Sequence, residues 1–350
     1  MNKQNIGYAV LGLGIGMAHA DAAYASKNAD LVAVCDVDEA RLAKAQRKYA
    51  GVTAYTDFED LLADPRVDII SICLPSAMHA DFAVRAMEAG KHVLVEKPLD
   101  ITPERAALIE DARRRTGMTC GVVHQNRFNA NMYPIKEAVD SGRLGRLVLG
   151  TFGVKWYREQ SYYDNGGWRG TWEMDGGGSL MNQAVHTVDL MQWLMGDVAS
   201  VTSAMGIYDH DIKTEDMTAS LIKFKSGAAA TFVSTTCAYP GISTEIMLYG
   251  TGGSIEADAD TLKTWKMKNS PDEESEEAEM LSLYGEGNLS VMMREPQRLF
   301  GHAHVVEDMI LAVRDGRDPE VMPAEALKAV KIVCAVYESA KTGKTIYFPS

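Results

Sequence analysis

The chain has 350 residues, of which 46% are hydrophobic and 24% are charged, a composition typical of globular proteins. This length exceeds what one hydrophobic core usually organises, so we expect two domains. The formal net charge of -13 argues against a general nucleic-acid binder and against docking on anionic lipid, because both functions need a basic surface.

Five cysteines are scattered along apolar segments, and no two have the spacing of a zinc site or of a CxxC redox pair. We therefore expect free thiols, a reducing cytoplasmic location and no metal site. No apolar run is long enough to span a membrane. The first 25 residues share features with a signal peptide, but their glycines are better explained by a nucleotide-binding turn.

Residues 6–124 alternate between strand and helix patterns. Short apolar runs are typical of strands buried on both faces of a parallel sheet; they are IGYAVLGLG, LVAVCD, VDIISICLP, HVLVEKP and TCGVVHQN. Helical patterns separate them, and one of these has Thr102 as its cap, Pro103 in its first turn and Gly117 as its stop. The alternation predicts an α/β domain with a doubly wound parallel sheet of the Rossmann type over residues 1–124.

The first apolar run ends in the glycine-rich stretch GLGIGMAH. Gly12 permits a tight turn, and Gly14 lets the backbone approach a pyrophosphate bound at the N-terminus of the following helix. The third glycine of this fingerprint belongs at position 17, where this chain has Met17, and Gly16 stands one position early. The alternative interpretation is a glycine-rich turn without a ligand.

An acidic residue ends the second apolar run. Asp36 follows Gly14 by 22 residues, where a carboxylate accepts hydrogen bonds from the adenosine ribose hydroxyls of a dinucleotide. The alternative is a solvated strand end. A carboxylate there would repel the 2′-phosphate of NADP, so we expect NAD in preference to NADP.

Polar residues follow two further apolar runs. CLPSAMH places Pro75, Ser76 and His79 at one strand end, and VEKP places Glu96 and Lys97 at another. Because ligands bind at that edge of a parallel sheet, we expect these residues to border the cofactor. A lysine there can hold a substrate hydroxyl and help move its proton, with the glutamate as counter-charge; the alternative is a surface ion pair. The residues expected to bind the cofactor are Gly12, Leu13, Gly14, Ile15, Gly16, Met17, Asp36, Leu74, Pro75, Ser76, His79, Glu96, Lys97 and Gln125.

After His124 the alternation stops, and we expect a second domain over residues 125–350. Four stretches predict antiparallel strands and hairpins: RLVLGTFGVKW, VASVTSAMGIY, MTASLIKFKSGAAATFVSTT and TEIMLYGTGGSIEAD. Residues 126–141 predict one helix, and residues 303–342 predict two before a last strand. The stretch SPDEESEEAE, residues 270–279, predicts a solvated acidic loop.

The stretch DGGGSLMNQAVHTVDLMQWL carries polar side chains on an amphipathic helix that three glycines open. Asn182, His186 and Asp189 recur at i, i+4 and i+7, so on an α-helix they share one face. A face with these three residues is not typical of a plain core; the alternative is a core histidine bonded to backbone.

The stretch WYREQSYYDNGGWRGTW lies just before that helix. Tyr157 and Trp168 offer flat apolar faces for sugar rings, and Arg158 and Arg169 offer forked donors for hydroxyls or carboxylates. The alternative is a packed aromatic loop at a domain junction.

These motifs resemble those of the Gfo/Idh/MocA oxidoreductase family. The resemblance is carried by GLGIGMAHA, LPSAMHADFAVRAMEAGKHVLVEKPL, HQNRFN, SGRLGRL, WRGTWEMDGGGSLMNQAVHTVDLMQWLMG and GHAHVVEDMILAVRDGRDP. It implies a Rossmann domain, then an α/β domain with a large, open, mainly antiparallel sheet that binds the substrate and mediates oligomerisation. It also implies a nicotinamide cofactor, a sugar-like alcohol as substrate, and a homodimer or homotetramer.

By resemblance, Lys97 and His186 are the catalytic residues, and the bond from Lys97 to Pro98 is cis. His302, from FGHAH, is a further candidate for the same pocket. We therefore expect the substrate to contact Asn182, Tyr157, Arg158, Trp168, Arg169, Asp189 and His302, with Asp189 orienting its neighbours rather than acting as the base.

The substrate class is narrowed by one departure from the family pattern. Inositol-dehydrogenase-like members carry an aspartate four residues before the histidine, where this chain has Asn182, and asparagine cannot take a proton. The segment from WRGTW to the histidine resembles the branch that oxidises pyranoside rings at C3, which includes UDP-N-acetylglucosaminuronate 3-dehydrogenases. The alternatives are an inositol or free-aldose dehydrogenase of the same fold, and a non-catalytic regulator that senses NAD and sugar.

Overall fold

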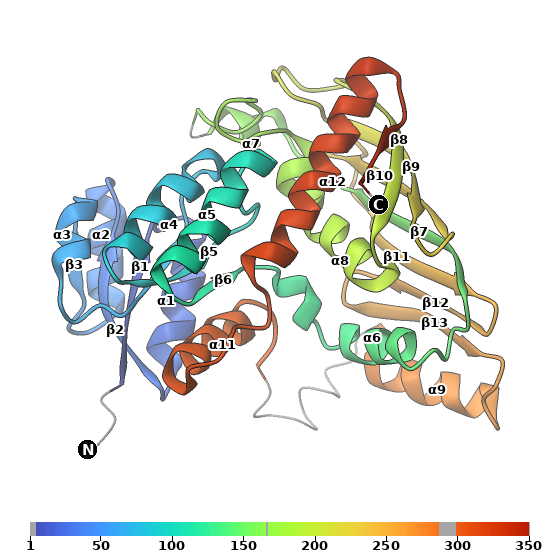
Figure 1. Cartoon of the computed structure of the whole chain (residues 1–350), viewed down its shortest axis with the longest axis horizontal. Helices are drawn as coiled ribbons and strands as arrows, with labels where there is room; N and C mark the ends of the chain where they lie inside the picture. The colour runs from blue at the N-terminus through green and yellow to red at the C-terminus, as the bar shows by residue number, and fades with distance from the viewer. Residues whose placement is uncertain (1–4, 166, 287–298, 350) are drawn as a thin grey trace. The chain divides into compact units, whose positions relative to one another are not determined.

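A computed structural model gives the structure of the protein and describes residues 5–165, 167–286 and 299–349 (Figure 1). These residues form two compact units. The first contains residues 5–125 and Leu299–Leu327, and the second contains residues 126–286 and 328–349. All five cysteines are free thiols, as predicted. Over the described ranges, no helix has both the length and the apolar character that a membrane span requires.

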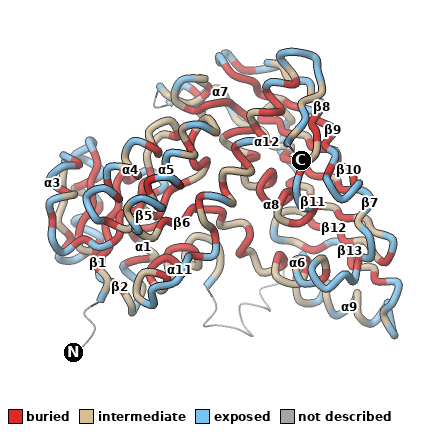
Figure 2. The backbone as a smooth tube through the Cα atoms, in the orientation of Figure 1, coloured by how far each residue is buried: buried red, intermediate tan, exposed pale blue. Residues whose placement is uncertain are grey.

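The first unit is built on a six-stranded parallel sheet, as the alternating pattern predicts. Its strand order is β3-β2-β1-β4-β5-β6, the order of a doubly wound Rossmann sheet. The central strands are buried (Figure 2), which explains why their sequences are continuous apolar runs. The strands are β1 (Ile6–Leu11), β2 (Ala29–Cys35), β3 (Thr53–Tyr55), β4 (Ile69–Ile72), β5 (His92–Val95) and β6 (Cys120–Val122).

The helices of the first unit begin and end at residues with clear capping roles. The Thr102 hydroxyl accepts a hydrogen bond from the backbone N–H of Arg105, and Gly117 ends the same helix at a φ of 71°. The helices are α1 (Gly16–Ala25), α2 (Glu39–Lys48), α3 (Phe58–Ala63), α4 (His79–Glu88), α5 (Pro103–Thr116) and α11 (Gly301–Asp315), with a short 3-10 helix η1 (Ser76–Met78).

Helix α11 packs against α1 although nearly 280 residues separate them in the sequence. Glu307 of α11 accepts hydrogen bonds from the Ser26 hydroxyl at 2.7 Å and from the Asn28 amide at 2.6 Å. These contacts attach α11 to the rest of the first unit.

The second unit contains an eight-stranded, mainly antiparallel sheet of order β13-β12-β11-β7-β10-β9-β8-β14, as the family resemblance implies. Among the described strand pairs of this second sheet, only β7 with β10 is parallel. The strands are β7 (Leu147–Lys155), β8 (Val198–Gly206), β9 (Met217–Phe224), β10 (Ala229–Thr235), β11 (Ser243–Gly250), β12 (Gly253–Asp258), β13 (Thr261–Met267) and β14 (Ile346–Tyr347).

One face of this sheet is covered by helices. Phe152 and Phe232 of the sheet pack in one core with Ile135 of α6, Val188 of α8 and Val333 of α12. The opposite side of β9 is exposed, and alternation of buried and exposed residues along the strand follows from this arrangement. The helices are α6 (Met132–Asp140), α7 (Gln160–Asp164), α8 (Val185–Met195), α9 (Glu273–Tyr284) and α12 (Pro323–Thr342), with the short helices η2 (Gln125–Phe128) and η3 (Ser179–Ala184).

The prediction of a solvated loop for the acidic stretch 270–279 is wrong, because most of it forms α9. Asp272 caps the helix by accepting from the backbone N–H of Ser275, and glutamates in the first turn suit the positive end of the helix dipole. Tertiary contacts add to this local preference: Glu276 accepts from the indole of Trp265 at 2.7 Å and pairs with Arg143. A charge pattern alone does not reveal such contacts.

Candidate active site

The residues expected to bind a dinucleotide follow the carboxyl ends of β1, β2, β4, β5 and β6. All five strands are parallel, so these ends lie along one edge of the sheet. The glycine turn follows β1, Asp36 follows β2, and the segment from Leu74 to His79 follows β4. Glu96 and Lys97 follow β5, and Gln125 begins η2 after β6.

The glycine turn has the backbone that close approach of a ligand requires. Gly12 has a φ of 90°, and an added Cβ would lie 2.4 Å from the carbonyl oxygen of Cys73. Gly14 has open space where a Cβ would lie, so its backbone is accessible. A Cβ on Gly16 would lie 2.7 Å from Val10 Cγ1, so this glycine allows α1 to pack closely on β1. Gly16 therefore takes the packing role of the third glycine, one position before Met17.

Asp36 is buried beside this turn, where backbone donors fix its carboxylate. Oδ2 accepts from the N–H of Leu13 at 2.6 Å, and Oδ1 accepts from the N–H of Asp38 at 2.9 Å. The guanidinium of Arg41 lies 3.5 Å from Oδ2. A carboxylate can accept about four hydrogen bonds, so capacity remains for a ribose hydroxyl. The turn and the carboxylate together fit the phosphate and ribose of a dinucleotide.

His79 connects two of the predicted cofactor segments. Its Nδ1 lies 2.7 Å from the carbonyl oxygen of Pro98, and its Nε2 lies 2.9 Å from the carbonyl oxygen of Leu74. Its ring is buried, as is Ser76 at the start of η1. Both partners of the ring are backbone carbonyls, so the structure shows His79 holding the segments after β4 and β5 together rather than facing a ligand.

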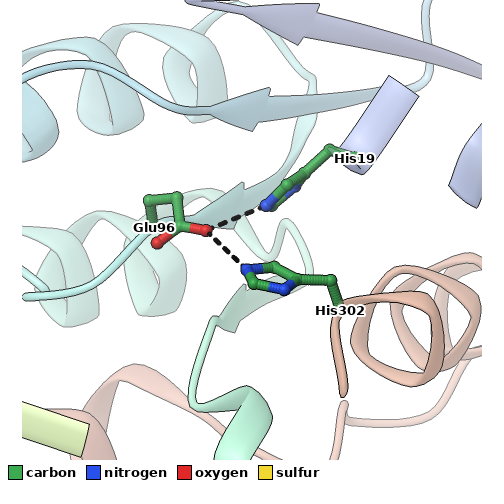
Figure 3. Close-up of side chains that lie close together, drawn as sticks. All are labelled: His19, Glu96 and His302. Carbon is green, nitrogen blue, oxygen red and sulfur yellow. Dashed lines mark hydrogen bonds and ion pairs between the residues drawn. The ribbon is translucent and has the colours of Figure 1, made fainter. Parts of the chain in front are cut away.

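The Glu96 carboxylate lies between two imidazole rings (Figure 3). His19 Nε2 is 3.0 Å from Glu96 Oε1, and His302 Nε2 is 3.5 Å from the same oxygen. The backbone N–H of Lys97 donates to Oε2 at 3.0 Å. The bond from Lys97 to Pro98 is cis, as the resemblance implies. Glu96 is therefore held on three sides, directly before the lysine.

Two hydroxyl groups lie in line with the ring of His19. The hydroxyls of Tyr8 and Ser71 are 2.5 Å apart, and Ser71 Oγ is 2.9 Å from His19 Nδ1. Within the part of the chain that the structure describes, Ser71 is the hydrogen-bond partner of the buried Tyr8 hydroxyl, so Tyr8 donates to Ser71. An unsatisfied buried O–H would cost about 1–3 kcal/mol. The ionised carboxylate of Glu96 can only accept, so His19 donates to it from Nε2 at 3.0 Å.

This network determines the charge of Glu96. Burial raises the pKa of Glu96, but hydrogen bonds from His19 and His302, with the charge of Lys97, hold that pKa well below its ordinary value. Glu96 is thus ionised at neutral pH. The histidine at position 19 was within the GLGIGMAHA motif, but no local pattern indicates that it reaches Glu96, and it was not among the predicted site residues.

In the second unit, the helix that carries Asn182 and His186 differs from the predicted one. Residues Ser179–Ala184 form a π-helix, and α8 begins only at Val185. The α-helical offset assumed between Asn182 and His186 therefore does not hold across this junction. Wider π turns are frequent at functional sites, and no periodic signal in the sequence marks this one.

Asn182 is held by side chains that the sequence analysis did not single out. Its Nδ2 donates to the buried Asp175 at 2.6 Å, and its Oδ1 accepts from Gln183 at 3.1 Å. Gln183 also donates to the Tyr162 hydroxyl at 2.6 Å and accepts from Arg158 at 3.2 Å. The predicted Asn182 and Arg158 thus meet in one network through Gln183. The half-buried His186 lies four residues after Asn182.

The aromatic stretch before this helix places two guanidinium groups over aromatic rings. The Arg158 guanidinium lies 5.4 Å and the Arg169 guanidinium 4.7 Å from the Tyr162 ring centroid. Arg169 also lies over Trp168 at 5.0 Å. Tyr157 packs edge-on against Tyr239, at 5.3 Å between centroids. Both guanidinium groups therefore lie within cation–π distance of aromatic rings.

Asp189 forms a buried ion pair with Arg127. Its two oxygens accept from the guanidinium at 2.7 Å and 2.6 Å, and both side chains are at least 95% buried. The pair ties α8 to η2, and the role of Asp189 toward the substrate stays a prediction. Lys97 belongs to the first unit and His186 to the second.

Comparison with known proteins follows the same division. Residues 6–124 match the oxidoreductase family with an NAD-binding Rossmann fold, and residues 134–256 match the GFO/IDH/MocA C-terminal domain. The chain belongs to the Gfo/Idh/MocA oxidoreductase family. The WlbA dehydrogenase of Bordetella pertussis, solved in complex with NADH and UDP-GlcNAcA, is 29% identical with a TM-score of 0.89, covering 100% of this chain and 99% of that one.

Curated relatives in the family act on several substrates. D-glucoside 3-dehydrogenase of Escherichia coli is 30% identical over 56% of each chain, and myo-inositol 2-dehydrogenase of Thermotoga maritima is 28% identical over 71% of this chain and 74% of that one. The 1-carboxy-3-chloro-3,4-dihydroxycyclohexa-1,5-diene dehydrogenase of Comamonas testosteroni is 34% identical over 58% of this chain and 51% of that one. The chain therefore spans about half the length of two of these relatives.

In this family member, a second buried carboxylate anchors the start of the π-helix. Glu215 Oε2 accepts from the N–H of Gly178, and Oε1 accepts from the N–H of Leu180, both at 2.8 Å. The Tyr337 hydroxyl donates to Oε1 at 3.1 Å. A Cβ on Gly178 would lie 1.9 Å from the Glu215 carbonyl oxygen, and one on Gly177 would lie 2.0 Å from the Tyr337 hydroxyl. The glycines are therefore needed for this contact.

We predict that Glu215 makes stability depend on pH near neutrality. Burial raises the pKa of Glu215 to about 7, although its hydrogen-bond donors lower it. A raised folded pKa adds stability below the unfolded pKa, and this stability is lost as pH rises through about 7. Denaturant unfolding of the wild type and of Glu215→Gln from pH 5 to 8.5 measures it. As pH rises from 5 to 8.5, the unfolding free energy of the wild type should fall by about 2–3 kcal/mol relative to that of Glu215→Gln. Parallel curves for the two proteins would contradict this.

Proposed function

We propose that the protein is an NAD-dependent dehydrogenase that acts on a ring hydroxyl, at C3, of a sugar, glycoside or sugar nucleotide. The observation that carries the proposal is the position of Lys97. It follows β5 on the sheet edge that holds the glycine turn and Asp36, and the ionised Glu96 precedes it. A titratable amine beside a dinucleotide site is the group that hydroxyl oxidation needs.

The proposed chemistry divides between the two units. Bound nicotinamide would supply the hydride acceptor or donor. The Lys97 amine would hold the reacting hydroxyl and accept its proton during oxidation, while Glu96 keeps the resulting ammonium in place. His186 would hold the same hydroxyl from the second unit and share the acid–base role, as the family resemblance implies.

The substrate proposal draws on the relatives and on the polar groups of the second unit. WlbA was solved with a sugar nucleotide, and the Escherichia coli relative is named for position 3 of a glucoside. In this chain, Arg158 and Arg169 present guanidinium groups beside aromatic rings, an arrangement that suits a sugar ring with a carboxylate or phosphate.

An inositol is a second candidate substrate, because one relative is a myo-inositol 2-dehydrogenase. Asn182 argues against it. Its Nδ2 already donates to Asp175, and its Oδ1 already accepts from Gln183, so part of its hydrogen-bonding capacity is used. An amide also cannot act as a base.

We predict that Lys97→Met abolishes turnover while NADH still binds. The assay measures product mass with NAD and a panel of UDP-sugar uronates, simple and aryl glucosides, glucose and myo-inositol, with a 2-oxo acid to reoxidise tightly held cofactor. Loss of general acid–base catalysis should lower kcat by about 100- to 10,000-fold. The exposed Lys44→Met serves as control. Retained turnover in Lys97→Met would contradict the proposal, and wild-type protein that binds NADH but converts nothing would favour a sensor.

We predict that Asp36→Asn shifts cofactor preference toward NADP. The amide keeps one acceptor for the N–H of Leu13 but removes the charge that would repel a 2′-phosphate, and Arg41 lies 3.5 Å from the carboxylate. The ratio of kcat/KM for NADP to that for NAD should rise about tenfold or more. An unchanged ratio would show that Asp36 does not set the preference.

We also propose that the open face of the second sheet mediates a homo-oligomer, as the family resemblance implies. Leu149 and Leu221 are 41% and 48% exposed, and strand alternation and register place both on the same face, on β7 and β9. Apolar side chains on a sheet face favour contact with another such face.

We predict that Leu221→Arg lowers the oligomeric state, because a charge buried in an apolar interface is strongly unfavourable. Light scattering after size-exclusion chromatography measures the mass. Leu108→Arg, at an equally exposed leucine on α5, is the matched control. A wild-type protein that is already monomeric would contradict the proposal.

A further inference from the structure

The imidazoles of His19 and His302 both face one oxygen of the Glu96 carboxylate. We propose that His19 and His302 are positioning residues, which hold the Glu96 carboxylate ionised and immobile directly before Lys97. This inference rests on the catalytic role proposed for Lys97. Neither histidine needs to contact substrate to perform it.

The contacts leave the Glu96 side chain little freedom. Oε1 faces His19 at 3.0 Å and His302 at 3.5 Å, while Oε2 accepts from the backbone N–H of Lys97 at 3.0 Å. The side chain is 3% exposed. Because one oxygen is bonded to the Lys97 backbone, a shift of the carboxylate would move the residue that carries the amine. Small displacements of a reacting group are known to lower rates strongly.

The two histidines hold the carboxylate from different sides. His19, on α1, is fully buried, and its Nε2 donates to the Glu96 carboxylate, which can only accept. His302, in the first turn of α11, is 25% exposed and approaches the same oxygen from the solvent side. Among the described residues, further titratable groups coupled to Glu96 include Lys97 and the buried thiol of Cys73 after β4.

Two imidazoles and a carboxylate within 4.8 Å of one another could also hold a divalent cation. The contact between His19 and Glu96 argues against this use. A metal ligand needs a lone pair at His19 Nε2, whereas at 3.0 Å from a carboxylate oxygen this nitrogen carries the proton that it donates. The arrangement suits an anion at Glu96 with donors around it.

The test compares leucine and glutamine at both positions, His19→Leu, His19→Gln, His302→Leu and His302→Gln. Leucine removes the donor, whereas the glutamine amide can place an N–H near the position of Nε2. His304→Leu is the matched control, since His304 lies on the same helix and pairs with Glu320 at 2.9 Å. The measurements are kcat, KM and the pH profile of kcat, with NADH affinity, melting temperature and metal content of each protein.

We expect each leucine variant to lose about 10- to 100-fold in kcat with little change in NADH affinity. Its pH profile should gain an ionisation that the wild type lacks, because Glu96 without a donor takes up a proton more readily. The glutamine variants should recover most of the rate and lose the added ionisation. In the wild type, ¹⁵N NMR should show the Nε2–H tautomer of His19, a readout that does not need turnover.

Several results would overturn the inference. These are wild-type kcat in both leucine variants, a loss that is equal at every pH and equal in the glutamine variants, or an equal loss in His304→Leu. A bound transition metal that disappears in His302→Leu, or an Nδ1–H tautomer at His19, would do the same. An inactive Lys97→Met with fully active leucine variants would overturn this inference alone, whereas an active Lys97→Met would remove the proposed function as well.

Discussion

A carboxylate that is withdrawn from water must find hydrogen-bond donors inside the protein, because an unpaired buried charge is strongly destabilising. Two such carboxylates, one in each unit, lie directly beside residues expected to act on the substrate or to hold it. Glu96 precedes Lys97, and Glu215 binds the backbone where the helix of Asn182 begins. Much of the surrounding structure, including the glycines at 177 and 178, provides space and donors for these two groups.

The two carboxylates meet this constraint in different ways. Glu96 takes imidazole donors and lies near a cation, and its pKa falls well below the ordinary range. Glu215 takes mainly backbone donors in a fully buried setting, and its pKa rises to about 7. The first is thus a permanent charge next to the proposed reaction. The second changes its charge within the range of pH that cells experience, at the base of the helix that carries His186.

The local parts of the site are readable from the sequence, because a short motif and its neighbouring strand determine them. Gly12, Asp36 and Lys97 each follow an apolar run, so a parallel sheet necessarily brings them to one edge. The parts that depend on distant contacts were not predictable. His302 reaches Glu96 only because α11 returns to the first unit, and Glu215 meets Gly178 through a loop of no distinctive composition. The π turn at Asn182 and the helix at 273–284 also depend on tertiary partners rather than on periodicity.

The return of α11 has a consequence for the order in which the protein is made. The first unit is not contiguous in the chain, because Leu299–Leu327 belongs with residues that precede 126. While the ribosome is still adding the second unit, the sheet of the first can already pair, yet Glu96 lacks the imidazole of His302, and Ser26 and Asn28 lack Glu307. Domains usually fold in the order of synthesis. Here the lysine segment reaches its final surroundings only after α11 (Gly301–Asp315) has emerged, so a nascent chain that lacks α11 carries an incomplete site.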